Sequence, residues 1–245
     1  MNSRLQQAFA QSSAVKIISG LNNFDVTSVL KVVRAAEAGG ATYVDIAATP
    51  TLVRAVRQAI DLPICVSGVD PQPLVDAVNA GADLVEIGNF DTFYAHGRRF
   101  EAPEVLALTI ATRKALPSTT LSVTVPHILP LDEQVELAQA LVVAGANLIQ
   151  TEGGTSTQPT QPGILGLMTK AVPTLAAAHA ISRAIDVPVL CASGLSSATI
   201  PLAIATGASG VGVGSAVNRL DNELAMVAAV RALVEALPSG MTVRT

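Results

Sequence analysis

The chain of 245 residues lacks tryptophan and has few aromatic and few charged residues. Aromatic residues make up 3% of it and charged residues 14%, whereas hydrophobic residues make up 50%. A chain of this composition buries a large core and does not stay disordered. Since aromatic side chains are scarce, we expect a core of Ala, Val, Ile and Leu, which suits a parallel sheet covered on both faces.

Other features that the sequence lacks limit the class of binding partner and the cellular compartment. No basic block is present and the net charge is −4, which disfavours nucleic acid and anionic membranes as partners. We see no apolar run long enough to cross a bilayer, and Met1 to Ser13 lacks a signal-peptide core. The two cysteines, Cys65 and Cys191, lie far apart in apolar runs, which indicates a reducing, cytoplasmic setting. No metal-ligand spacing is seen, so we predict no metal.

Short β-branched runs alternate with Ala-rich amphipathic stretches along the whole chain. The expected strands are Val15–Ser19, Tyr43–Ala47, Ile64–Ser67, Leu84–Gly88, Leu121–Val125, Leu148–Thr151, Val189–Ser193 and Val211–Gly214. The expected helices are roughly 26–38, 50–60, 71–80, 102–116, 131–144, 172–186, 196–206 and 222–237. Eight strand–helix units predict an α/β protein with a single (β/α)8 TIM-barrel domain over residues 1–245. An open doubly wound sheet is the rival, but Ser19–Asn23 lacks its glycine-rich fingerprint.

The short motifs that precede the predicted strands repeat in the same order in both halves of the chain. Gly-Ala, Asp-x-Pro and Gly-Ala precede strands two to four and again strands six to eight, which predicts two related half-barrels. The halves differ in an insertion of about residues 153–169, rich in Gly, Thr, Pro, Ser and Gln. We predict a flexible loop there that acts as a lid, with a decoration of no function as the alternative.

Glycines follow the last two predicted strands, where barrels often bind phosphate. The chain reads Ser193-Gly194-Leu195-Ser196-Ser197 after the seventh strand and Gly214-Ser215 after the eighth. Glycine lets the backbone approach an anion, and a helix that begins at each loop would add its dipole, with Ser196 and Ser197 as N-cap candidates for the first. We therefore predict phosphate binding by Ser193, Gly194, Leu195, Gly214 and Ser215, with help from Arg219. The alternative is a pair of tight turns without a ligand.

Charged residues inside predicted strands need a reason, because barrel strands are mostly apolar. Lys16, Asp45 and Glu86 fall on one strand phase, which we expect to face the barrel interior, and all three are candidate catalytic residues. Lys16 on the first strand can pair with Asp45 on the second. It is a candidate Schiff-base nucleophile with a lowered pKa, a candidate cation for an enolate, or one half of a structural ion pair.

Two further candidates follow strands at the same end of the barrel. Glu152 ends the sixth strand and His127 follows the fifth, so both are candidate acid–base groups. Glu152 is alternatively a cap for the loop after it. The segment Asn89–Glu101 holds four of the seven aromatic residues together with His96, Arg98 and Arg99. It is either a ligand-recognition loop or an ordinary loop folded over the rim.

Motifs along nearly the whole chain carry a resemblance to a known family. They are Val15–Phe24, Val44–Ala47, Ile64–Val69 and Ile149–Gly154. The chain resembles the TIM-barrel proteins of cyanobacteria and algal plastids known as hypothetical chloroplast reading frame twenty-three. That resemblance implies the fold and a setting, cytoplasmic or plastid stroma, but no catalytic residues, because the family has no established reaction. More loosely, the last two strands resemble ribulose-phosphate-binding and FMN-dependent barrels, which implies a phosphorylated ligand.

Three functions remain open at this point. The first is a lyase, isomerase or aldolase-type enzyme that acts on a small phosphorylated metabolite without a cofactor. The second is an oxidoreductase whose FMN places its phosphate in the same loops. The third is a metabolite-binding or scaffold protein without a reaction. The sequence leaves homo-oligomer formation open.

Overall fold

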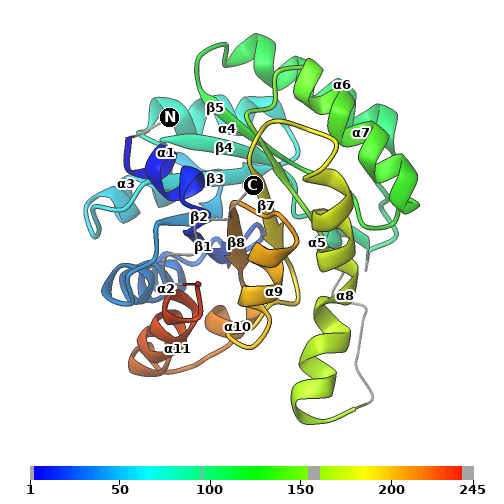
Figure 1. The fold of residues 1–245 in the computed structure, drawn as a ribbon. Coiled ribbons are helices and arrows are strands. Elements are labelled where there is room, and N and C mark those ends of the chain that lie inside the picture. Colours follow the sequence, from blue (N-terminus) through cyan, green and yellow to red (C-terminus); the bar gives the residue numbers. More distant parts are fainter. Residues whose placement is uncertain (1–2, 95, 154–160, 239–245) are drawn as a thin grey trace.

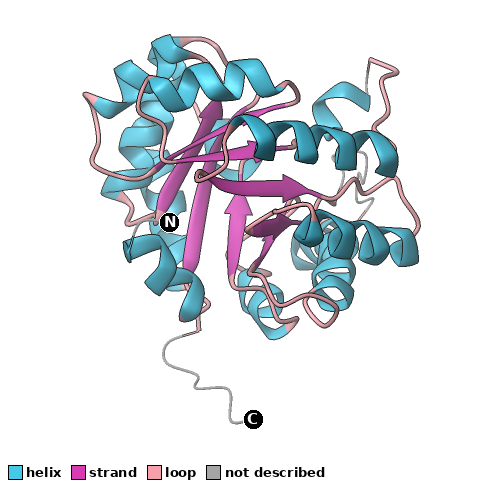
Figure 2. Cartoon of the chain, turned by 90° about the horizontal axis from the view of Figure 1, so that it is seen from above, coloured by secondary structure: helices cyan, strands magenta, loops and turns pink. Residues whose placement is uncertain are grey.

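Eight parallel strands form a closed barrel in which each strand pairs with its neighbours in chain order (Figures 1 and 2). The computed structural model describes residues 3–94, 96–153 and 161–238. The strands are β1 (Ala14–Gly20), β2 (Tyr43–Ala47), β3 (Ile64–Gly68), β4 (Leu84–Ile87), β5 (Thr120–Thr124), β6 (Leu148–Gln150), β7 (Val189–Ala192) and β8 (Gly210–Val213). The predicted fold class is confirmed, and each strand lies within one residue of its expected bounds.

Helices surround the barrel. They are α2 (Val26–Ala38), α3 (Pro50–Arg57), α4 (Pro71–Asn79), α5 (Asp91–Tyr94), α6 (Ala102–Ala115), α7 (Leu131–Val143), α8 (Gly163–Ile181), α9 (Ile200–Ala205), α10 (Ser215–Asn218) and α11 (Glu223–Glu235). The glycines that mark the repeat share one conformation, since Gly40, Gly81, Gly145 and Gly207 all have positive φ. The superposition of the two half-barrels stays a prediction.

The segment before β1 forms a helix that the sequence analysis missed. Helix α1 (Ser3–Ala10) buries Leu5 and Phe9, four residues apart on one face, against side chains from the first residues of the strands. Phe9 meets the ring of Tyr43 edge-on, with 6.1 Å between the ring centroids. Helix α1 therefore covers the N-terminal end of the barrel, and the functional groups gather at the other end.

The predicted strand phase is confirmed. Lys16, Asp45, Glu86 and Gln150 are all buried inside the barrel, and their side chains contact one another. Neighbouring strands pair without a shift at these positions, as Lys16 with Gly212 and Glu86 with Ser122 show. Because side chains alternate along a strand, the apolar residues between them face the helices.

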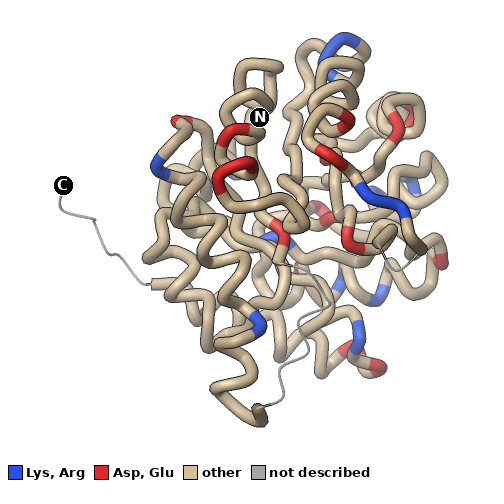
Figure 3. The backbone as a smooth tube through the Cα atoms, turned by 90° about the vertical axis from the view of Figure 1, so that its right-hand side faces the viewer, with Lys and Arg blue, Asp and Glu red and all other residues tan. Residues whose placement is uncertain are grey.

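Helix α8 corrects two expectations. Residues 154–160 of the predicted loop lie outside the described residues, so its mobility stays a prediction, but residues 163–169 are helical and not loop. The glycines Gly163 and Gly166 made this stretch resemble a loop. Its start, free of charged residues, projects from the barrel (Figures 1 and 3).

By length and composition alone, α8 is apolar enough to cross a membrane, contrary to the expectation that no run is. Only 33% of its most apolar window is buried. The second half of the helix packs as a barrel helix, with Ala171, Thr174, Ala177 and Ile181 buried. A core helix of a barrel passes the same test, so this feature is weak support for a membrane span.

Candidate functional site

A cavity of about 750 Å³ opens at the C-terminal ends of the strands. Residues that follow β1, β4, β6, β7 and β8 line it, and Gln150 and Gly212 lie in its floor. A cavity of this volume accommodates a ligand the size of a sugar phosphate. The active face predicted from the fold is thus the face with the cavity.

All five residues predicted to bind phosphate line this cavity. The backbone N–H groups of Gly194, Leu195, Gly214 and Ser215 have no hydrogen-bond acceptor among the described residues. Gly194 has φ +72°, and an added Cβ would lie 2.5 Å from the carbonyl oxygen of Lys170, so only glycine fits there. Lys170 and Arg219 also line the cavity and bring positive charge to these loops.

The helix argument for this site needs a correction. Helix α9 begins at Ile200, and Ser196 and Ser197 do not cap it, since its N-cap is Thr199. Instead the Ser196 N–H donates to Thr199 Oγ1 at 2.9 Å within a turn that precedes the helix. The dipole of α9 therefore does not begin at the first glycine loop, whereas the short helix α10 begins at the second, with Gly214 as its N-cap.

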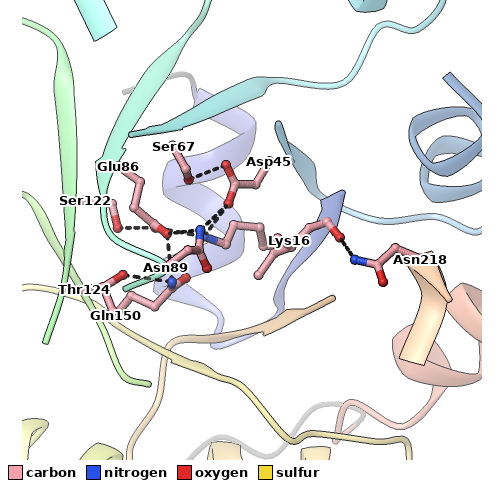
Figure 4. A network of polar contacts seen from close by, with 10 residues as sticks. Lys16, Asp45, Ser67, Glu86, Asn89, Ser122, Thr124, Gln150 and Asn218 are labelled. Atoms are coloured by element: carbon pink, nitrogen blue, oxygen red, sulfur yellow. Dashed lines mark hydrogen bonds and ion pairs between the residues drawn. The ribbon is translucent and has the colours of Figure 1, made fainter. Parts of the chain in front are cut away.

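A buried ion cluster lies beneath the cavity floor (Figure 4). The Nζ of Lys16 is 2.8 Å from Glu86 Oε2 and 3.4 Å from Asp45 Oδ2, and each of the three side chains is at most 1% exposed. Although burial lowers the pKa of Lys16, the charges of Glu86 and Asp45 raise it well above its ordinary value. Lys16 is therefore held as a cation. This contradicts the Schiff-base hypothesis, which required a lowered pKa for Lys16.

Hydrogen bonds from neighbouring strands complete the cluster. Ser67 Oγ donates to Asp45 Oδ1 at 2.6 Å, and Ser122 Oγ donates to Glu86 Oε2 at 2.9 Å. Burial raises the pKa of Glu86, and the charge of Lys16 opposes that shift. Asn89, at φ +60°, places Nδ2 3.5 Å from both Asp45 Oδ2 and Glu86 Oε1. Sequence reasoning did not single out Ser122, although it occupies the interior phase.

Glu152 and His127 meet at the mouth of the cavity. Glu152 Oε2 lies 3.0 Å from His127 Nδ1, and Glu152 Oε1 accepts the Asp91 N–H at 2.8 Å. The Tyr94 hydroxyl donates to Glu152 Oε2 at 3.4 Å. Glu152 and Asp91 line the cavity, and His127 contacts both, with Nε2 3.9 Å from Asp91 Oδ1. Glu152 thus both anchors the loop after β4 and orients the imidazole.

His127 is expected to lose its contribution to stability as the pH rises through the raised pKa of its imidazole. Burial lowers the pKa of His127, but the hydrogen bond and charge of Glu152 and the charge of Asp91 outweigh this and raise it. A group whose pKa is raised by folding stabilises the fold below its unfolded pKa of about 6.5 and loses that contribution as the pH rises through the folded value. Urea unfolding of the parent and of His127→Gln between about pH 6 and pH 9 measures this. The stability gap between the two proteins should shrink with rising pH, and a constant gap would contradict the assignment.

The aromatic loop after β4 is mostly part of the core. Phe90 and Phe100 are fully buried with ring centroids 4.5 Å apart, and the Arg98 guanidinium stacks 4.5 Å from the Phe100 centroid. The Tyr94 ring meets His127 edge-on at 5.2 Å, and Asn89, Asp91, Thr92 and His96 of the same segment line the cavity. Phe90 and Phe100 therefore belong to the core, and ligand recognition by the rest of the loop stays a prediction.

No group of three or more metal-ligating side chains with suitable geometry occurs in residues 3–94, 96–153 and 161–238.

Over residues 1–242, the sequence matches the family described as "Protein of unknown function (DUF561)". The chain belongs to the DUF561 family. It is 43% identical to the "Uncharacterized protein ycf23" of Cyanophora paradoxa, covering 93% of each chain. It is 39% identical to the ycf23 protein of Pyropia yezoensis, covering 93% of this chain and 83% of the relative. The resemblance stated from the motifs is confirmed.

Solved structures share the barrel of this DUF561 protein. A 3-hexulose-6-phosphate synthase superposes with TM-score 0.66 at 19% identity, covering 92% of this chain and all of that one. The (S)-3-O-geranylgeranylglyceryl phosphate synthase of Thermoplasma acidophilum, in complex with sn-glycerol-1-phosphate, gives TM-score 0.64 at 14% identity, covering 97% and 99%. At sequence identities this low, the structural similarity shows that the chains share the TIM-barrel fold.

Proposed function

We propose that this protein binds a small phosphorylated metabolite at the barrel mouth and acts on it as a lyase, isomerase or aldolase-type enzyme without a cofactor. The observation that carries the proposal is the set of four backbone N–H groups on the loops after β7 and β8 that have no acceptor among the described residues. Buried or half-buried N–H groups are rarely left unpaired in proteins, so a bound anion is their natural acceptor. Solved structures that share the fold are named for phosphorylated compounds, which supports the same class of ligand.

The acid–base chemistry falls to His127 and Glu152. Lyases, isomerases and aldolases share a proton transfer next to a carbonyl group, and a positioned imidazole–carboxylate pair performs it. Burial lowers the pKa of His127, but Glu152, 3.0 Å from Nδ1, and Asp91 raise it, which favours the protonated ring as a proton donor. Lys16, Asp45 and Glu86 lie beneath the floor and support it through Gln150 and Asn89.

We place the protein in the cytoplasm, or in the plastid stroma for the algal relatives.

Calorimetric titration with ribulose 5-phosphate, inorganic phosphate and ribulose tests the ligand class. Charged hydrogen bonds to the phosphate should make the phosphorylated sugar bind at least about tenfold more tightly than ribulose. Equal affinity for the two sugars would overturn the proposal. A yellow purified protein whose visible spectrum is that of a flavin would replace it by the FMN-dependent alternative.

A further inference from the structure

We propose that Gln150 recognises a hydroxyl group of the ligand, so that the ligand is a phosphorylated polyol and not a simple alkyl phosphate. This inference rests on the proposed phosphate site and adds a second contact to it. Gln150 ends β6 in the cavity floor and is only 2% exposed. Its role follows from the way its amide group is held.

The hydrogen bonds of Gln150 fix which atom of the amide faces which way (Figure 4). The Nε2 atom donates to Glu86 Oε1 at 2.8 Å and to Thr124 Oγ1 at 3.1 Å. A carboxylate only accepts hydrogen bonds, so the amide nitrogen must be the atom beside Glu86. The amide cannot turn over without losing the hydrogen bond to Glu86, whereas the Thr124 hydroxyl could pair with either atom, so Glu86 sets the direction of Oε1.

The Oε1 atom of Gln150 is left without a hydrogen-bond partner in the part of the chain that the structure describes. A buried acceptor without a donor costs about 1–3 kcal/mol, and such an exception calls for a ligand or a water molecule. Gly212 lies beside it, and an added Cβ there would be 3.4 Å from Oε1 and 2.9 Å from the Ala192 Cβ. Gln150 and Gly212 both line the cavity, and glycine at this position adds no side chain against the acceptor.

The distance between the Gln150 contact and the proposed phosphate contact limits the length of the ligand. Gly212 marks the position of Gln150 Oε1, and Gly214 belongs to the phosphate loop two residues further along the chain. Two residues of a strand span about 7 Å. A carbon chain of about three to five atoms joins a phosphate to a hydroxyl over that distance. An alkyl phosphate of the same length would leave Oε1 unpaired and would lose the benefit of the contact.

Two phosphate esters that differ only in their hydroxyl groups test the inference. Glycerol phosphate should bind the parent protein about tenfold more tightly than n-propyl phosphate, since only the former donates to Oε1. Gln150→Met keeps the length of the side chain but removes the acceptor. In that variant, the affinity for glycerol phosphate should fall to that for propyl phosphate, while inorganic phosphate binds as before.

Ser122→Ala is the matched control, because it also removes a hydrogen bond to Glu86 but leaves Gln150 intact. It should keep the tenfold preference. Equal affinity of the parent for the two esters overturns the inference, even if the Gln150 variant does not fold. A preference that persists in Gln150→Met also overturns it. Failure of the inorganic phosphate and of both esters to bind would instead refute the proposed function, and the inference with it.

Discussion

Replacing Lys16 by methionine is expected to lower the free energy of unfolding by about 3–5 kcal/mol. The side chain is fully buried between Glu86 and Asp45, and methionine has nearly the same length without the charge. The cost comes from the two carboxylates, which the variant leaves buried without their cation. Urea unfolding of the parent and of Lys16→Met measures the difference.

The double variant Lys16→Met, Glu86→Gln separates the charge from the packing. It removes one of the two uncompensated carboxylates and should recover part of the lost stability, although Glu86→Gln alone should destabilise the parent. A cost below about 1 kcal/mol for Lys16→Met would contradict the account, because exposed ion pairs contribute no more than that. The outcome also decides whether the cluster is a structural support of the floor.

Replacing Gly214 by leucine is expected to lower the affinity for phosphate about 100-fold, equal to about 2.7 kcal/mol, while the barrel stays folded. Gly214 has a negative φ, and an added Cβ would meet its nearest atoms, Asn218 Nδ2 and Ile18 Cβ, at an ordinary 3.6 Å. A short side chain therefore fits, but the longer side chain of leucine extends into the cavity. Gly194 is a poorer choice, since its backbone approaches Lys170 too closely for any side chain.

Gly214→Ala is the control for this variant. It adds the same Cβ without the bulk, keeps the backbone N–H, and should retain most of the affinity. Calorimetric titration with inorganic phosphate compares the three proteins, and circular dichroism shows whether each is folded. The same affinity for parent and Gly214→Leu would place the anion elsewhere and remove the main support for a phosphorylated ligand.

The fold could be predicted because its signals are local and repeated. β-branched runs alternate with helical spacing, so the strand bounds and the interior phase followed from periodicity alone. The pairing of Lys16 with Asp45 followed from their adjacent strands. The closer contact of Lys16 with Glu86 on β4 did not, because it runs across the barrel interior and depends on closure.

The errors have physical reasons as well. Helix α1 was missed since only two apolar residues, Leu5 and Phe9, mark its buried face in a polar segment. The start of α8 was taken for loop because of its glycines. The serines after β7 were taken for helix caps, but a turn precedes α9. The sequence left the aromatic residues after β4 open between ligand recognition and packing at the rim, and Phe90 and Phe100 pack against each other.

The candidate site was partly visible in the sequence. Asp91, His127 and Glu152 follow the consecutive strands β4, β5 and β6, so their meeting at one rim is a consequence of barrel order. The loops that we propose to bind phosphate were visible as glycines after β7 and β8. The free acceptor of Gln150 was not, because an unpaired atom is a property of the folded hydrogen-bond network and no sequence pattern marks it.

The most direct test of a phosphate site is a crystal of the parent protein soaked in tungstate, a heavy-atom analogue of phosphate. Our account predicts an anomalous peak within hydrogen-bond distance of the N–H groups of Gly194, Leu195, Gly214 and Ser215, which have no acceptor among the described residues. The same soak of Gly214→Leu should show no peak there. An anomalous map with tungstate bound elsewhere and none between these two loops would contradict the account.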